Sequence, residues 1–226
     1  MITALLPLTM LGAVVGLDTV SFPQAMLSRP LVAATLGGML VGAPVSGLLV
    51  GATLELIAVE TLPFGASRYP EWGSASVVGG ALLGSHPTPS AGAMTLALLA
   101  ALATAWVGGW TMVKLRQLNG KWAARSREAL DAGSRGAVIG LQLKGMTADL
   151  VRGALLTAVA VVVFVPLTEA SLALWTVDAR VSRAVNVGVA ISVALGAVWK
   201  LFHASITARW MFAAGLALGA AFMVLQ

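Results

Sequence analysis

The sequence predicts an all-α integral membrane protein, a multi-helix bundle with broken or re-entrant helices. Of its 226 residues, 58% are hydrophobic and only 10% are charged, whereas soluble domains carry about 25% charged residues. A soluble core of this length could not bury so much apolar surface, but a bilayer sets no such limit. The chain also has 25 glycines and nine prolines. Broken helices at membrane depth are tolerated where the freed backbone groups line a cavity or pack inside protein.

The first third of the chain is predicted to contain short or bent apolar segments. Residues 2–17 form a first membrane segment, which we interpret as retained because no positively charged residue precedes it, as one would in a signal peptide. The polar, proline-interrupted stretch 21–29 predicts a broken or re-entrant piece. Residues 30–54 carry no charge and several glycines, which predicts a tightly packed hairpin or one long bent helix. Residues 62–72 predict a loop or a second re-entrant tip.

The middle of the chain combines an uncharged region with a basic one. Residues 73–113 carry no Asp, Glu, Lys or Arg, and Pro87 and Pro89 predict a turn that divides them into two apolar pieces. Residues 114–144 hold seven of the 14 Lys and Arg against only two acidic residues, so the positive-inside rule places this region in the cytoplasm. Its first part predicts an amphipathic helix on the membrane surface, with a solvated linker helix as the alternative.

Three further spanning segments are predicted at 153–167, 184–199 and 210–225. Strict alternation from a cytoplasmic basic region places residues 169–183 outside, residues 200–209 inside and the C-terminus outside. We therefore expect a single membrane domain, 1–226. It divides into a half that holds the candidate site, about 1–113, a basic cytoplasmic connector, about 114–149, and C-terminal helices, about 150–226.

Polar side chains concentrate within the apolar stretch 16–66. A carboxylate at Glu55, between apolar neighbours, must be neutralised, paired or hydrogen-bonded to a ligand. We expect it to contact a solute or a gate, with a structural pair to Arg29 or to a backbone terminus as the alternative. Gln24 and Thr53 are uncharged hydrogen-bonding groups of the kind that bind sugar hydroxyls, although such groups also hold membrane helices together. Polar residues at membrane depth usually face a cavity, so this stretch predicts a polar-solute site.

Other polar residues allow two interpretations each. Asp18 could cap a following helix or bind the solute, and the sequence favours neither. Arg29 precedes a proline, which predicts an extended residue at a helix start, and its charge could satisfy Glu55, Asp18 or a lipid phosphate. Glu60 is expected at the membrane interface. His86 could carry protons during transport, but a turn histidine that bonds the backbone is the preferred interpretation.

Several function classes are excluded by what the sequence lacks. The absence of cysteine rules out disulfides and thiolate chemistry, and two histidines make a histidine metal site improbable on composition alone. The sequence contains no G-x-S-x-G, H-E-x-x-H or G-x-x-x-x-G-K motif. We therefore predict no catalytic residue, no metal and no cofactor. The net charge of +5 is attributed to cytoplasmic loops and not to nucleic-acid binding.

Two runs of residues resemble one known family. The first contains Gly16, Asp18, Gln24, Met26, Leu27, Ser28, Arg29, Pro30, Leu31 and Val32. The second contains Gly51, Ala52, Thr53, Leu54, Glu55, Leu56 and Ile57, and a later patch contains Pro63, Phe64, Gly65, Ala66, Pro70 and Glu71. Over about residues 12–95 the sequence is similar to the IIC membrane subunits of the mannose/fructose/sorbose family of the bacterial sugar phosphotransferase system (PTS).

The resemblance implies a function and a set of partners. It implies a sugar-translocating subunit (EIIC) of a multi-pass permease in the bacterial inner (plasma) membrane. Such a subunit passes a hexose-type sugar to a IIB partner, which phosphorylates it with a phosphoryl group received from IIA, so the chain itself is not an enzyme. It also implies pairing with a IID membrane subunit and a trimer of IIC–IID pairs. The predicted sugar site comprises Gln24, Thr53, Glu55 and Asp18, with support from Ser28, Arg29 and His86.

Two other functions fit the residues. A membrane subunit of the same fold could serve regulation or assembly without transporting sugar. Alternatively, an ion-coupled secondary transporter could use Glu55 as a proton or sodium site.

Overall fold

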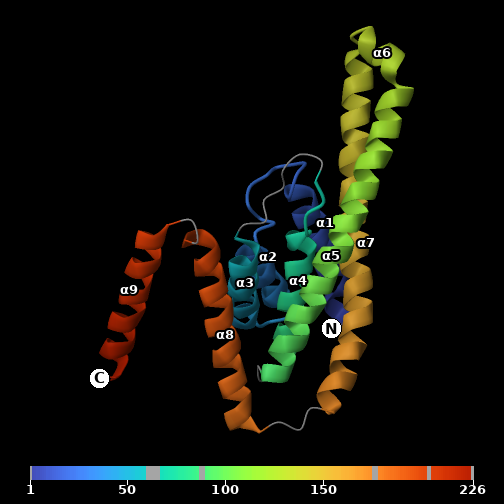
Figure 1. The fold of residues 1–226 in the computed structure, drawn as a ribbon. Coiled ribbons are helices and arrows are strands. Elements are labelled where there is room, and N and C mark those ends of the chain that lie inside the picture. Colours follow the sequence, from blue (N-terminus) through green and yellow to red (C-terminus); the bar gives the residue numbers. More distant parts are fainter. Residues whose placement is uncertain (1, 60–66, 87–89, 175–177, 203–204, 225–226) are drawn as a thin grey trace.

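The computed structural model describes residues 2–59, 67–86, 90–174, 178–202 and 205–224. All regular elements in these ranges are helices, which confirms the predicted fold class (Figure 1). A 3-10 helix, Ile2–Ala4, precedes the first α-helix. In chain order the α-helices are α1 (Leu5–Asp18), α2 (Pro30–Leu40), α3 (Pro44–Ala58), α4 (Trp72–Gly84), α5 (Ala91–Arg125), α6 (Arg127–Asp131), α7 (Arg135–Ala173), α8 (Ala179–Phe202) and α9 (Ile206–Val224).

Helix α4 lies at the centre of the body. Every residue from position 73 to position 83 is buried, because α1, α2, α3, α5 and α7 all pack against this helix. An apolar cluster that includes Leu8, Leu54, Val77 and Leu83 fills the space between these helices. A helix that is apolar on all sides belongs inside protein, and α4 occupies that position.

Helices α2 and α3 form a hairpin, one of the two arrangements predicted for residues 30–54. The chain reverses at residues 41–43, where Gly42 has φ of +85°. Close backbone contact holds the hairpin on α4. A Cβ atom on Gly37 would lie 2.5 Å from the Val77 carbonyl oxygen, so no larger residue fits there. Small residues that allow such an approach are a common basis of helix association in membranes.

The helices of the body are too short to cross a bilayer individually. Helices α1 to α4 have 14, 11, 15 and 13 residues, whereas a spanning helix needs about 20. By contrast, α5, α7 and the described part of α8 are long and apolar enough to cross a membrane. The predicted fold, a membrane helix bundle with broken or re-entrant helices, therefore agrees with the short helices of the body.

The basic middle of the chain forms a long antiparallel hairpin instead of a surface helix. Helices α5 and α7 continue beyond the body and meet at α6 (Figure 1). Residues 114–125 extend α5 along its own axis, so the prediction of an amphipathic helix lying on the membrane surface is wrong. The arms contact one another along their length, and Lys144 Nζ lies 4.4 Å from the centre of the Trp122 ring. Such cation–π contacts stabilise exposed sites by about 0.5–1 kcal/mol.

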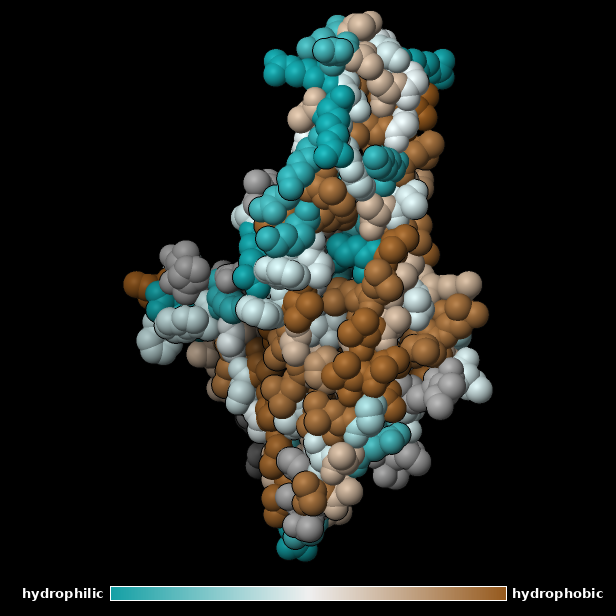
Figure 2. All heavy atoms as spheres, turned by 90° about the vertical axis from the view of Figure 1, so that its right-hand side faces the viewer, coloured by the Kyte–Doolittle hydropathy of each residue, from teal (hydrophilic) through white to brown (hydrophobic). Residues whose placement is uncertain are grey.

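Helix α8 packs against α3 and α5 at the edge of the body, and α9 follows beyond it (Figure 1). Helix α8 runs in the same direction as α3 and α5: near its start, Ser182 Oγ accepts a hydrogen bond from the Ala91 amide at the start of α5 (2.8 Å), and near its end, Lys200 Nζ donates to the Ile57 carbonyl at the end of α3 (3.4 Å). Most described side chains of both helices are exposed within this chain. Figure 2 shows a broad apolar surface over the body and polar side chains on the hairpin, the distribution expected of a protein with one part in lipid and another in water.

Candidate functional site

The loop of residues 19–29 between α1 and α2 is organised around Asp18. This carboxylate is 2% exposed, and its two oxygens accept hydrogen bonds from the Ala25 amide (2.6 Å) and the Ser28 amide (2.9 Å). Asp18 is the last residue of α1. The interpretation that Asp18 caps a following helix is therefore wrong. Helix α2 starts after Arg29, which makes no side-chain cap.

A second buried acidic residue holds the same loop from α7. Ser21 Oγ donates to Asp149 Oδ2 (2.7 Å), and Arg152 Nε donates to Asp149 Oδ1 (2.9 Å). Arg152 also reaches the Gly16 carbonyl with a distance of 3.5 Å. The side chains of Asp149 and Arg152 are 2% and 8% exposed. Sequence reasoning missed this pair, although an acidic and a basic residue three positions apart at the start of an apolar segment are a usable signal.

A cavity of about 250 Å³ lies under this loop, and we call it the loop cavity. Its walls come from the end of α1, the start of α2, the end of α3 and residues 69–72. Ligand sites usually measure about 300–1,000 Å³, so the loop cavity suits a small solute. The structure brings four of the predicted site residues together here. The lining consists of Asp18, Thr19, Gln24, Met26, Ser28, Arg29, Pro30, Ala58, Tyr69, Pro70 and Trp72.

The backbone of the loop adopts an uncommon conformation at the cavity. Gln24 and Met26 have φ of +58° and +63°, a region that residues other than glycine rarely occupy. Such conformations persist only where the surroundings enforce them, and they cluster at ligand sites. Gln24 Nε2 donates to the Val20 carbonyl (3.0 Å). Within the described residues its Oε1 has no partner, so the amide retains an acceptor for a solute.

Glu55 forms an ion pair with Arg29, the structural alternative considered for it. Glu55 Oε1 pairs with the Arg29 guanidinium, and Oε2 accepts a hydrogen bond from the Leu31 amide (3.1 Å). Glu55 is absent from the lining of the loop cavity, whereas Arg29 is part of it. In this structure Glu55 therefore fixes the start of α2 and positions Arg29 at the cavity.

Two aromatic residues, Tyr69 and Trp72, also line the loop cavity, and sequence reasoning did not select them. Between them, Glu71 is fully buried and accepts a hydrogen bond from the Ser74 amide (3.2 Å), which caps α4. Burial raises the pKa of the Tyr69 phenol, although the Arg116 guanidinium, 4.9 Å from the ring centre, acts in the opposite direction. The phenol consequently keeps its proton at neutral pH and can donate a hydrogen bond.

The remaining predicted site residues lie elsewhere. Thr53 Oγ1 donates to the Leu49 carbonyl (3.0 Å) and lines a separate cavity of about 260 Å³ beside α8. His86 lines a cavity of about 480 Å³ at the far end of α4. Glu60 and the patch at 63–66 lie outside the described residues. Thr53, Glu55 and His86 are thus absent from the lining of the loop cavity, and of the three only Glu55 contacts a lining residue, Arg29.

Short helices around a cavity, next to helices long enough to span a membrane, are typical of multi-pass membrane transport proteins. The family model described as PTS system sorbose-specific IIC component matches residues 1–197, so the chain belongs to this family and is a membrane subunit of PTS sugar transport. This confirms the resemblance found in the sequence.

Two solved structures share the fold. One is a membrane protein with a TM-score of 0.70 and 21% identity, where the match covers 100% of this chain and 94% of the other. The second is the mannose transporter ManYZ in complex with microcin E492, with a TM-score of 0.62, 20% identity and coverage of 97% and 87%. The comparison with curated proteins found no match.

Proposed function

We propose that this chain is the sugar-translocating IIC subunit of a phosphoenolpyruvate-dependent PTS, and that it binds a hexose-type sugar in the loop cavity. The observation that carries this proposal is the loop of residues 19–29. Its amides are fixed by Asp18, and it presents Gln24 to a cavity lined by Tyr69 and Trp72. Sugars need hydrogen-bonding groups for their hydroxyls and flat apolar surfaces for their ring faces, and this cavity offers both.

The phosphoryl group is supplied by partners in this proposal. A IIB domain, charged by IIA, phosphorylates the sugar as it leaves the loop cavity, so the chain acts as a non-catalytic transport subunit. The lining of the loop cavity supports this role because it contains hydrogen-bonding and aromatic groups but no histidine or cysteine to carry a phosphoryl group. Membership of the PTS IIC family supports it as well.

The fold also supports an orientation and a membrane partner. At the end of the bundle remote from the α5–α7 hairpin, the described residues include only two of the 14 Lys and Arg, namely Arg180 and Arg183 at the start of α8. The positive-inside rule therefore places the hairpin and the loop cavity on the cytoplasmic side of a bacterial inner membrane. Exposed apolar faces on α8 and α9 suit a IID membrane subunit, with IIC–IID pairs assembling as trimers. A mannose transporter has a similar fold.

Sugar binding by variants of the loop cavity tests the proposal. Gln24→Ala removes the amide, and Trp72→Ala removes the ring surface, so each should weaken binding about tenfold or more, which corresponds to about 1.4 kcal/mol. Thr53→Ala should bind normally because its hydroxyl bonds within α3 and faces another cavity. The measurement is calorimetry with D-mannose, D-fructose and L-sorbose on the complex with the partner subunits. Normal binding by both cavity variants would contradict the assignment.

The energy source of uptake separates this function from ion-coupled transport. We expect uptake in vesicles to require phosphoenolpyruvate and the partner proteins, and to continue when an uncoupler collapses the proton gradient. The structure favours this outcome because Glu55, the residue considered as an ion site, is already paired with Arg29. Uptake that stops with the gradient while phosphoenolpyruvate is present would instead support a secondary transporter.

A further inference from the structure

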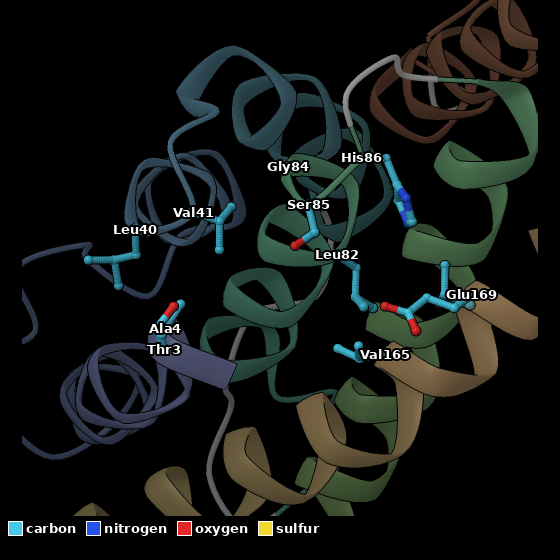
Figure 3. Close-up of a pocket in the computed structure, with 11 residues that line it drawn as sticks. Thr3, Ala4, Leu40, Val41, Leu82, Gly84, Ser85, His86, Val165 and Glu169 are labelled. Atoms are coloured by element: carbon cyan, nitrogen blue, oxygen red, sulfur yellow. The ribbon is translucent and has the colours of Figure 1, made fainter. Parts of the chain in front are cut away.

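A second cavity, of about 480 Å³, lies at the opposite end of the bundle, and we call it the distal cavity (Figure 3). Helices α2 and α4 connect the two cavities: their first residues, Pro30 and Trp72, line the loop cavity, and their last residues, Leu40 and Gly84, line the distal cavity. At 1.5 Å per residue these helices separate the cavities by about 15–20 Å. No residue lines both cavities, so they are two distinct places for a ligand.

The distal cavity carries two polar side chains, His86 and Glu169, that are available to a ligand. Figure 3 shows His86 and Glu169 on the side formed by the end of α4 and by α7, opposite Leu40 and Val41 on the α2 side. Within the described part of the chain, neither the His86 imidazole nor the Glu169 carboxylate has a hydrogen-bond or ion-pair partner. The hydroxyls of Thr3 and Thr168 add to the same lining, and so does the Ser85 hydroxyl, which donates to the Ala81 carbonyl (2.7 Å) and can still accept a hydrogen bond.

The electrostatics of the distal cavity favour a neutral ligand with hydroxyl groups. The C-terminal ends of α2 and α4 each present about half a negative charge, and the Glu169 carboxylate adds a full one. The start of α1 contributes a positive helix end, which offsets only part of this. Hydroxyl groups can donate to such acceptors, whereas a phosphate, with about two negative charges at neutral pH, is repelled.

We propose that the distal cavity is a second sugar site, on the outer face, which takes the free sugar before phosphorylation and rejects the sugar phosphate. This inference rests on the proposed function and on its orientation, in which the distal cavity faces away from the cytoplasm. Sugar binds there first and reaches the loop cavity afterwards. Because the product is a phosphate ester, the acceptor-rich distal cavity opposes its return.

The absence of cysteine from the chain allows a site-specific test. Ser85→Cys places a single thiol in the distal cavity, Ser28→Cys places one in the loop cavity, and Arg180→Cys is a control at the exposed start of α8. Each variant is produced with the partner subunits in right-side-out and inside-out vesicles. A membrane-impermeant maleimide then reports how fast the thiol reacts, with and without a mixture of D-mannose, D-fructose and L-sorbose.

The proposal predicts that Ser85→Cys reacts from the outside and that the free sugars slow its labelling about fivefold or more when they exceed their Kd several-fold. Sugar 6-phosphates should not slow it. When Glu169→Gln or His86→Ala is combined with Ser85→Cys, the free sugars should no longer slow the labelling. Gln24→Ala, which weakens binding in the loop cavity, should leave this protection intact. Labelling of Arg180→Cys should not respond to sugar.

Other results overturn the proposal. Labelling of Ser85→Cys only in inside-out vesicles would exclude an outer site, and equal protection by sugar phosphates would exclude the stated selectivity. Protection that disappears with Gln24→Ala would show that it is transmitted from the loop cavity. If the sugars protect Ser28→Cys but not Ser85→Cys, the distal site fails while the proposed function stands. If the sugars slow the labelling of neither cysteine, the result would contradict the proposed function as well.

Discussion

Replacing Gly80 by alanine is expected to prevent the chain from forming a stable body. An added Cβ atom would lie 2.7 Å from the Ala34 carbonyl carbon of α2, a distance that real Cβ contacts do not show. The backbone of α2 cannot move away from α4, because Gly47 of α3 packs against the same Ala34 carbonyl from the other hairpin arm. The single methyl group must therefore separate α2 from α4 at the centre of the body.

The expected cost is large for such a small change. Overpacking a well-packed core destabilises by about 1–3 kcal/mol, and more where backbone must shift, and the contact here is with backbone on a fixed hairpin. We expect Gly80→Ala to lower the free energy of unfolding by about 3 kcal/mol or more. The measurement is the temperature at which the purified complex aggregates, together with its yield from membranes.

Gly140→Ala is the matched control for this prediction. Gly140 also lies inside an α-helix, α7, but no atom would come within 4 Å of its added Cβ. Alanine is the better helix former by about 1 kcal/mol, so this variant should be as stable as the parent or slightly more so. If Gly80→Ala behaves like Gly140→Ala, the close packing of α2, α3 and α4 is not what holds the body together.

The same packing explains why the fold could be predicted from the sequence. Apolar composition identified a membrane protein, and prolines and glycines identified short, interrupted segments. Composition and the spacing of prolines and glycines are properties of short stretches of sequence. They were sufficient to predict the short helices and, as one of two arrangements, the hairpin of α2 and α3. The hairpin of α5 and α7 was not predicted, because the charges at 114–144 do not reveal whether a helix bends onto the membrane surface or continues along its axis.

The candidate site could be predicted only in part, because its contacts join distant residues. Asp18, Gln24, Ser28 and Arg29 were found since one short stretch supplies them all. Asp149 was not selected because its role depends on a contact with Ser21, which is 128 positions away in the chain. Thr53 was selected for its chemistry, but the helical rotation of α3 turns it towards a different cavity. Residue type indicated which side chains could bind a solute, whereas the direction of each side chain required the fold.

Asp18→Ala is expected to remove the sugar site while leaving the helices of the body in place. Without the carboxylate, the Ala25 and Ser28 amides lose their acceptors. Hydrogen bonds to a charged group contribute about 1.5–3 kcal/mol each, so the loop would lose about 3 kcal/mol or more of stabilisation. Gln24, held at a positive φ by this loop, would then no longer be fixed at the cavity.

Hydrogen exchange and sugar binding together measure this effect. Amide exchange in residues 19–29 should accelerate about 100-fold or more in Asp18→Ala, as expected for a loss of about 3 kcal/mol of local stability, while exchange in α4 stays slow. Sugar binding should become undetectable. Asp18→Asn keeps the shape but only one acceptor oxygen, so it should fall between the variant and the parent.

Asp131→Ala is the control acidic substitution. Its carboxylate pairs with Arg127 at 3.5 Å on the exposed tip of the hairpin, where an ion pair contributes about 0–1 kcal/mol. It should change neither loop exchange nor sugar binding. Fast loop exchange with normal binding in Asp18→Ala would show that the sugar does not need a fixed loop. This result would contradict the assignment of the loop cavity as the sugar site. Slow exchange with lost binding would instead make Asp18 a direct ligand of the sugar.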